Sequence, residues 1–344
     1  MIRLLATCLL LLVSPGIQAQ EATATLGTGA RTLVMRSTTD IAIIQPALEA
    51  FLVSHPDMRI DYEQWGSNAL YANALSACTG ETPAADAVFS SAVHQMVDLV
   101  NSACASSYRS GLTQALPSAR RWRDELWGLT EEPTVLIYNR ALVPADDVPG
   151  NRFELLDLMR QKPDAYRGKI ATYDIAASGL GYLYAFSDSS EATTFGALLE
   201  GFARTQAVAT CCSAEIIEAV SQGRYLLGYN VLGSYVQNAA PTNVGVILPE
   251  DYTMFLSRAY MIPRQARDPD AAAALLDFLL SVEGQGLLSR AGLIYPDDPS
   301  ETGLLPSAKR FIALAPPLLV AVDRSNAETF LSVWNTAFPP VAVP

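Results

Sequence analysis

Short apolar runs alternate with longer segments of helical spacing along the first hundred or so residues of the chain. The strand-like runs cover residues 32–37, 55–65 and 85–91, and the helical segments that follow them cover 40–54, 66–78 and 92–103. Residues 20–30 form a polar leader before the first run. Strands that alternate with helices through short links pair in parallel, so the pattern predicts an α/β fold.

The pattern starts again after a strand at residues 134–138. A helix, a strand at 169–173 and a helix opening at Ser178 follow, and then another helix and strand between 211 and 230. Two strands are predicted between residues 243 and 263. The apolar stretch 268–292 contains Gly284, which predicts a break into two helices. The tail from 304 to 344 is mixed, with one amphipathic helix near 326–338.

The first nineteen residues have the layout of a secretory signal peptide. Arg3 precedes an apolar run at residues 4–13, and small and polar residues follow up to Ala19. This order predicts cleavage after about Ala19, and the apolar run is too short to span a membrane. The mature chain is therefore expected to be periplasmic.

The composition limits the classes of partner. The chain has 344 residues, half of them apolar, and a formal net charge of −12. Its length allows two domains, and its acidity argues against binding nucleic acid or an anionic membrane surface. An anionic ligand would need a local site that overcomes this average field.

Four cysteines remain after the predicted cleavage: Cys78, Cys104, Cys211 and Cys212. An even number in an exported protein suggests disulfides, and three pairings are possible. We predict Cys78–Cys104, because each residue ends a predicted helix in adjacent strand–helix units. The state of Cys211 and Cys212 is left open. The spacing does not match a zinc site, and no metal site or cofactor is predicted.

The order of these elements resembles the periplasmic solute-binding proteins of ABC importers, in the two-lobed type II group that includes ferric-ion, phosphosugar and phosphoglycerate binders. The stretches that carry the resemblance are "LVMRSTTDIAIIQPALEAF", "ADAVFSSA", "PTVLIYNRALV", "RGKIATYDIAASGLGYLY" and "DPDAAAALLDFLLSVEGQGLLSRAGLIYP". The resemblance implies lobe one at 26–133 and 258–344, lobe two at 134–257, two hinge crossovers and a ligand cleft between the lobes. It also implies a monomer that binds a small molecule without covalent chemistry and delivers it to an ABC permease.

Helix starts with hydroxyl and glycine residues mark the candidate ligand site. They lie at the carboxyl ends of strands, where open α/β sheets bind ligands, and the N-termini of helices bind anions. The predicted site comprises Arg36, Ser37, Thr38, Thr39, Ser67, Ser90, Ser91, Ser178, Gly179, Asn230 and Tyr235. Arg36 is predicted to grip a carboxylate or phosphate, although a shift of one residue along its strand would turn it away. Each helix start also has a purely structural interpretation as a cap.

Three other functions compete with this hypothesis. The tail "PPLLVAVDRSNAETFLSVWNTAF" resembles binding proteins that signal to two-component sensor kinases. A ferric-ion binder of this group typically has adjacent tyrosines, and this chain has no Tyr-Tyr pair. An exported hydrolase would need a nucleophile–base pair, and we find none in the sequence. We therefore expect no enzymatic activity and favour a small organic or phosphorylated anion as ligand.

Overall fold

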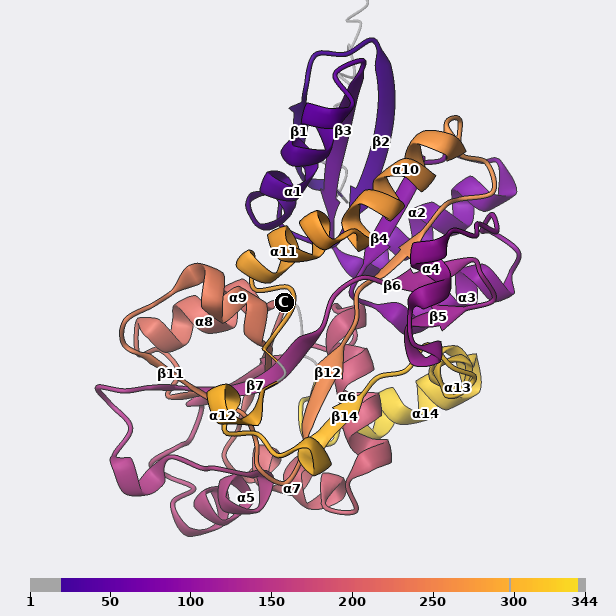
Figure 1. The fold of residues 1–344 in the computed structure, drawn as a ribbon. Coiled ribbons are helices and arrows are strands. Elements are labelled where there is room, and N and C mark those ends of the chain that lie inside the picture. The colour runs from indigo at the N-terminus through magenta and orange to yellow at the C-terminus, as the bar shows by residue number, and fades with distance from the viewer. Residues whose placement is uncertain (1–19, 297, 340–344) are drawn as a thin grey trace, which may run out of the picture.

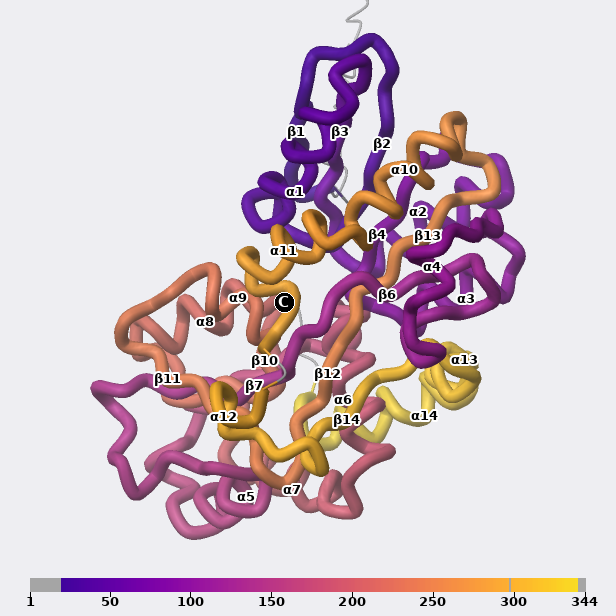
Figure 2. Tube along the Cα trace, in the orientation of Figure 1, coloured from indigo at the N-terminus to yellow at the C-terminus, as the bar shows by residue number. Residues whose placement is uncertain are grey.

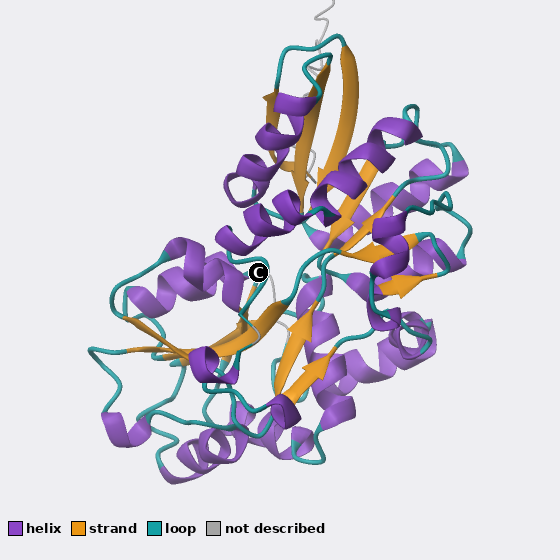
Figure 3. Cartoon of the chain, viewed as in Figure 1, coloured by secondary structure: helices purple, strands orange, loops and turns teal. Residues whose placement is uncertain are grey.

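The computed structural model describes residues 20–296 and 298–339 of the chain, so the predicted signal peptide at 1–19 lies outside the described residues. The chain forms two lobes, each with its own mixed β-sheet, and the lobes meet where several segments cross between them (Figures 1 and 2). Helices lie against both sheets (Figure 3). The predicted two-lobed α/β architecture is confirmed.

The sheet of lobe one is built around the strands nearest the N-terminus. Its strands, in spatial order, are β1 (Gln20–Leu26), β3 (Met58–Trp65), β2 (Arg31–Ser37), β4 (Ala87–Ser90), β13 (Ala259–Met261), β6 (Leu126–Gly128) and β5 (Arg121–Trp122). Strand β2 pairs in parallel with β3 and β4, whereas β1 pairs antiparallel to β3. The polar leader is therefore largely a strand. It lies at the edge of the sheet, where only Leu26 is buried, so it lacks the apolar signal of an inner strand.

Lobe two has a second sheet of similar size. Its path runs β14 (Lys309–Phe311), β12 (Thr253–Leu256), β7 (Glu132–Asn139), β10 (Leu227–Leu232), β8 (Ile170–Tyr173) and β9 (Val208–Thr210), and β11 (Val244–Ile247) also pairs with β7. The crossover strand β7 is buried along nearly its whole length. It therefore forms both a hinge segment and the centre of the second sheet.

The helices are short to medium in length and follow the strands as the sequence pattern predicts. Those nearest the sheet of lobe one are α1 (Ile41–Ser54), α2 (Ser67–Thr79), α3 (Val93–Asn101), α4 (Gly111–Ala115), α10 (Pro269–Leu280) and α11 (Val282–Arg290). Those after the first crossover and in the tail are α5 (Arg152–Gln161), α6 (Gly179–Glu191), α7 (Phe195–Arg204), α8 (Ser213–Ser221), α9 (Gly233–Ala239), α12 (Pro299–Thr302), α13 (Pro317–Val322) and α14 (Arg324–Trp334). The break in the apolar stretch falls at Ser281, which caps α11, and not at Gly284.

The tail differs from its predicted place in lobe one. Strand β14 pairs in parallel with β12 of the second sheet, and Trp334 and Phe338 pack in the core of lobe two. The chain therefore crosses a third time, beside Glu131, whose backbone N–H donates to Leu293 O and whose carbonyl accepts from Tyr295 N–H. Lobe one ends near this crossing, and the predicted segment 258–344 divides between the lobes. The mixed pattern of the tail did not indicate which sheet it would join.

The tail also touches both lobes. Leu314 donates its backbone N–H to Ala119 O, next to β5, over 2.8 Å. Helix α13 packs against α3, while the Tyr182 hydroxyl of α6 donates to the carbonyl of Ala321 over 2.8 Å. The yellow helices α13 and α14 lie beside the junction of the lobes in Figure 1. We call residues 309–338 the C-terminal strap.

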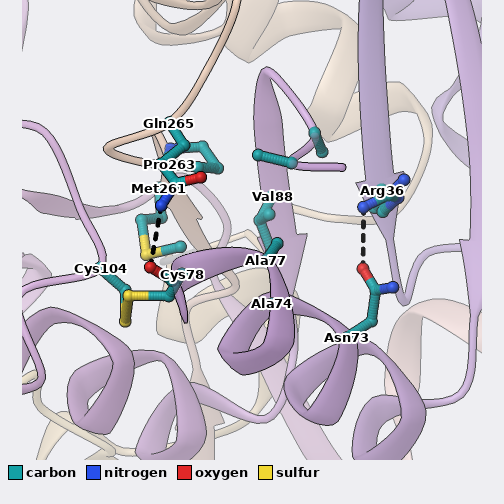
Figure 4. Close-up of a pocket in the computed structure, with 12 residues that line it drawn as sticks. Arg36, Asn73, Ala74, Ala77, Cys78, Val88, Cys104, Met261, Pro263 and Gln265 are labelled. Carbon is teal, nitrogen blue, oxygen red and sulfur yellow. Dashed lines mark hydrogen bonds between the residues drawn. A yellow bond between two sulfur atoms is a disulfide. The ribbon is translucent and has the colours of Figure 1, made fainter. Parts of the chain in front are cut away.

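The predicted disulfide between Cys78 and Cys104 is present. The two Cα atoms are 5.2 Å apart, and the cysteines are separated by 26 positions in the sequence. The bond joins the end of α2 to the segment after α3, at the edge of the main apolar core (Figure 4). It fixes the two strand–helix units to each other, as expected.

Within residues 20–296 and 298–339, no single helix has the length and apolar character needed to cross a membrane. Helices α10 and α11 reach that length only when taken together, and they meet at a bend of 70°.

Candidate ligand-binding cleft

A cleft of about 300 Å³ lies between the two lobes. Lobe one and the hinge contribute Glu21, Thr38, Asp40, Gln64, Trp65, Gly66, Ser67, Ser91 and Arg258. Lobe two contributes Tyr173, Ala177, Ser178, Leu180, Cys211, Cys212, Ser213, Ala214, Leu232 and Tyr235. Seven of the nineteen lining residues carry a hydroxyl group, which suits a ligand that is held by several hydrogen bonds.

Two hydroxyls of lobe one meet at the carboxyl ends of neighbouring strands. The Thr38 and Ser91 hydroxyl oxygens are 3.1 Å apart, and the Ser91 backbone N–H donates to Thr38 Oγ1 over 2.9 Å. Because β2 and β4 are parallel neighbours, the residues that follow them reach the same edge of the sheet. The structure thus brings the predicted site residues Thr38 and Ser91 together in the lining of the cleft.

The first turns of two helices lie at the cleft, where Ser67 of α2 and Ser213 and Ala214 of α8 are part of the lining. In α2, the N–H groups of Ser67, Asn68 and Ala69 have no hydrogen-bond partner within the described residues. The same holds in α8 for Ser213, Ala214 and Glu215, and Cys212 at its N-cap provides no side-chain bond. Such groups, together with the helix dipole, attract negative charge. They are the feature of the cleft that favours an anion.

Direct contacts between the lobes close one side of the cleft. The Gly179 N–H, at the start of α6, donates to Ser67 Oγ over 2.9 Å. Asn68 donates to the carbonyls of Ala176 and Ala177, each over 3.0 Å, and accepts from Gln95 over 2.8 Å. Ser67 and Gly179 were predicted to contact ligand, but here they bind each other. The Ser178 hydroxyl caps its own helix by accepting from Gly181 N–H, and Ser178 still lines the cleft.

Tyr235 closes the cleft from lobe two. Its hydroxyl donates to Asp40 Oδ1 of lobe one over 2.8 Å. Burial raises the pKa of Tyr235, with the nearby Arg258 charge opposing that rise. The phenol therefore stays neutral and acts as a hydrogen-bond donor at physiological pH. The prediction that Tyr235 faces the cleft agrees with this position.

Arg258 is a buried cation beside the cleft that sequence reasoning missed. Its Nε donates to Glu132 Oε1 over 2.8 Å, a second nitrogen donates to Glu132 Oε2 over 3.2 Å, and a third bond of 3.0 Å reaches Thr39 Oγ1. Both side chains of the ion pair are fully buried. Burial alone would lower the pKa of Arg258, but the charge of Glu132 raises it above its ordinary value.

The position of Arg258 explains why it was missed. It follows β12 and precedes β13, where no capping or periodicity signal marks a site. Its partner Glu132 lies more than a hundred residues away in the sequence, and no local pattern reveals such a counter-ion. The Thr130 and Ser234 hydroxyls also donate to Glu132, so its carboxylate is fully paired.

Arg36 does not reach the cleft. Its Nε donates to Glu63 over 2.8 Å, and its other bonds go to Asn73 Oδ1 over 2.8 Å and to the Pro83 carbonyl over 2.9 Å. Figure 4 shows Arg36 directed at Asn73 of α2, in a small pocket that also holds the Cys78–Cys104 disulfide. Strand alternation places it on the face opposite Met35 and Ser37. The predicted anion grip by Arg36 is therefore wrong in this structure.

Four other predicted site residues are buried behind the cleft. Ser37 accepts from Thr39 N–H, and Ser90 accepts from Ala92 N–H, so both hydroxyls shape backbone turns. The Thr39 hydroxyl accepts a hydrogen bond from Arg258. Asn230 lies inside lobe two, where it donates to Asp188 over 3.2 Å. These residues support the structure around the site but do not line it.

Neither histidine lies in the cleft. His94 is buried and stacks on Tyr182, with ring centroids 5.4 Å apart, and burial lowers the pKa of His94 to about 3. His55 stacks on Phe51 at the end of α1. A neutral, enclosed imidazole and an imidazole at a helix end do not form a catalytic pair.

Cys211 and Cys212 form a second disulfide, on the wall of the cleft at the start of α8. Their sulfur atoms and the Glu215 carboxylate lie within 4.8 Å of one another, the one such group of possible metal ligands within the described residues. Because the sulfurs are bonded to each other, they offer no thiolate to a metal.

The fold and the cleft define a class: a binding protein whose two lobes enclose a small molecule between them, with hinge segments at the junction. Residues 36–286 match the family of bacterial extracellular solute-binding proteins. The chain belongs to this family, whose members serve as the periplasmic ligand-binding components of ABC importers.

Solved structures agree with this assignment. The substrate-binding protein of an ABC transporter from Agrobacterium tumefaciens is 28% identical, with a TM-score of 0.85, and the match covers 92% of this chain and 98% of that one. AfuA from Actinobacillus pleuropneumoniae, a periplasmic binding protein solved with fructose 6-phosphate, is 15% identical with a TM-score of 0.70, over 91% and 100% of the two chains. Iron-bound HitA from Pseudomonas aeruginosa is 17% identical with a TM-score of 0.66, over 89% and 99%. The search among curated proteins found no match.

Proposed function

We propose that this protein captures a small anionic ligand, a carboxylate or a phosphorylated organic molecule, and delivers it to an ABC permease. The observation that carries this proposal is the pair of helix N-termini, α2 from lobe one and α8 from lobe two, whose first residues, Ser67 and Ser213, line one cleft and whose first-turn N–H groups have no partner within the described residues. Anions bind such groups without further charged residues. Hydroxyls of Thr38, Ser91 and Ser178 supply additional hydrogen bonds.

The charges around the cleft set the expected strength of binding. Arg258 adds a positive charge beside the cleft, but Glu132 already balances it. Asp40 and Glu21 line the cleft from lobe one and oppose an anion there. The ligand's negative group is therefore expected at α8 and α2, with its hydroxyl or carbonyl groups turned toward Asp40.

Ferric ion is a less well supported ligand. The tyrosines of the cleft are Tyr173 and Tyr235, and their hydroxyls bond to Ser213 and Asp40 respectively. Burial raises the pKa of Tyr173 to about 12. For a tyrosine to bind ferric ion as a phenolate, its hydrogen bond would have to break and its hydroxyl would have to lose a proton against the raised pKa. Ferric ion belongs in the test as a competing ligand, because a visible charge-transfer band would identify it.

A thermal-shift screen of the mature protein tests the ligand class. The panel contains inorganic phosphate, citrate, fructose 6-phosphate, 3-phosphoglycerate and ferric ion, with uncharged fructose as comparison. A ligand at a hundredfold excess over its dissociation constant stabilises the folded form by about 2.7 kcal/mol. Stabilisation by an anion supports the proposal, and stabilisation by neutral sugar or ferric ion alone would reject the anionic ligand.

A steric variant tests the location. Ala214 is exposed on the first turn of α8 and lines the cleft, so Ala214→Trp should fill it and abolish the ligand-induced shift. Ala203→Trp, on an exposed position of α7 away from the cleft, is the matched control and should retain the shift. Loss of uptake of the same ligand on deletion of the gene distinguishes an importer component from a partner of a sensor kinase.

A further inference from the structure

The disulfide between Cys211 and Cys212 occupies an unusual place for a structural bond. Both residues are exposed, both line the ligand cleft, and Cys212 is the N-cap of α8. The bond joins neighbours in the sequence and so closes no loop of the chain. A loop-closing role, which explains most disulfide stabilisation, therefore does not apply here.

The oxidised pair leaves the start of α8 available to a ligand. A disulfide carries no charge, and the N–H groups of Ser213, Ala214 and Glu215 have no partner within the described residues. A free cysteine at the same N-cap would behave differently. Helix N-termini lower the pKa of a thiol, and the resulting thiolate accepts hydrogen bonds from the first-turn N–H groups.

We propose that the Cys211–Cys212 disulfide is a redox-controlled part of the ligand cleft, which binds anions when oxidised and binds them more weakly when reduced. In the reduced protein the Cys212 sulfur occupies the N–H groups that otherwise hold the ligand, and its negative charge repels an anion. The inference rests on the proposed anionic ligand and extends that proposal, since it makes the anion affinity of the cleft depend on the redox state of Cys211 and Cys212.

The chemistry is thiol–disulfide exchange with a dithiol reductant. One thiolate of the dithiol attacks a sulfur of the Cys211–Cys212 bond and forms a mixed disulfide, which releases the other cysteine as a thiol. The second thiol of the reductant then displaces the remaining cysteine. The dithiol loses two electrons and two protons and becomes a disulfide, and Cys211 and Cys212 gain them as two thiols. The Cys212 thiol then releases its proton to the solvent and becomes the thiolate at the start of α8.

The second disulfide of the protein provides an internal comparison. Cys104 is 4% exposed and packs in the main core with Cys78 at its edge. Reductant therefore reaches the cleft pair more readily than the Cys78–Cys104 bond. Differential alkylation with peptide mapping identifies which cysteines have been reduced.

The experiment measures anion affinity by calorimetry before and after treatment with excess dithiothreitol. The probes are inorganic phosphate, citrate, fructose 6-phosphate and 3-phosphoglycerate, at about pH 8, close to the ordinary thiol pKa of about 8.5. A chelator is present throughout, because reduced Cys211 and Cys212 lie beside Glu215 and would otherwise bind trace metal. We expect about tenfold weaker binding after selective reduction, the scale of one charge at a helix N-terminus in a partly buried site.

Two double variants distinguish the effect of a negative charge at the start of α8 from the effect of the Cys211–Cys212 disulfide itself. The double variant Cys211→Ala/Cys212→Ala removes both sulfurs and should bind the probe equally with and without reductant. The double variant Cys211→Ala/Cys212→Asp places a permanent negative cap on α8 and should bind weakly under both conditions. Both positions are exposed, so the fold tolerates these changes.

Several results would overturn the inference. These are unchanged affinity after mapping shows Cys211 and Cys212 reduced, resistance of this pair to the reductant, or an equal response to reductant in the double alanine variant. If the oxidised protein binds none of the four anions, the proposed ligand class fails and this inference fails with it. If it binds one of them with an affinity that reduction does not change, only the redox control fails.

Discussion

Arg258 and Glu132 form a fully buried ion pair at the junction of the lobes, with Nε and Oε1 2.8 Å apart. Glu132 begins the crossover strand β7, and Arg258 lies on the return crossing between β12 and β13. Thr39 of lobe one and Ser234 of lobe two complete the network. The pair thus ties the first two crossings and both lobes to one point beside the cleft.

Glu132→Ala should destabilise the protein by about 3–5 kcal/mol, because it leaves the Arg258 charge buried without a partner. Urea denaturation of the protein without residues 1–19 measures the change. The control is Glu328→Ala, which removes an exposed ion pair with Arg324 on α14 and should change stability by no more than about 0.5 kcal/mol. Equal effects of the two substitutions would contradict the central role of the buried pair.

Gly179→Ala should weaken the contact between the lobes. A Cβ atom at Gly179 would lie 2.7 Å from Gln95 Nε2 and 2.9 Å from Asn68 Oδ1, so these side chains must move and their hydrogen bond is disturbed. We expect a shift toward open molecules, which small-angle X-ray scattering detects as a larger radius of gyration. Gly196→Ala has no atom within 4 Å of its Cβ and serves as the control. An unchanged radius of gyration in Gly179→Ala would show that the contact between the lobes at Ser67 and Gly179 tolerates the methyl group.

The two disulfides should contribute very differently to stability. Cys78→Ser/Cys104→Ser opens a loop with a sequence separation of 26 and should cost about 2–4 kcal/mol. Cys211→Ser/Cys212→Ser opens no loop and should cost far less. Denaturation curves of both double variants test this contrast, and a larger loss in the second variant would contradict the loop-closure argument.

Arg36→Ala should leave ligand affinity unchanged and lower stability by about 1–2 kcal/mol, since it removes a partly buried ion pair with Glu63. Calorimetry with the ligand found by the screen, together with denaturation, separates the two effects. A clear loss of affinity with intact folding would restore Arg36 to the site.

His94 should make the protein sensitive to acid. The pKa of His94 is lowered from 6.5 to about 3 by burial, so below pH 6.5 the unfolded chain binds a proton that the folded chain does not. Stability therefore falls as pH decreases from about 6.5 toward 3, by about 2 kcal/mol between neutral pH and about pH 5. His94→Gln should reduce this slope in denaturation measured at the two pH values, and an unchanged slope would assign the acid sensitivity to other groups.

The sequence predicted the parts of this structure that depend on local pattern. Alternating strands and helices predicted the α/β fold, the family resemblance implied two lobes, and hydroxyls at strand ends marked Thr38, Ser91 and Ser178, which line the cleft. The prediction that Arg36 binds the ligand was wrong because one step along a strand reverses the face to which a side chain points. Arg258 was missed because its function depends on a partner far away in the sequence, and the edge strand β1 was missed because it is mostly exposed.

The C-terminal strap adds contacts between the lobes to those that the crossing strands make. It holds lobe one through Ala119 and α3, and it holds lobe two through Tyr182 and the second sheet. A segment that is fixed to both lobes should therefore resist twisting of one lobe against the other when the cleft opens.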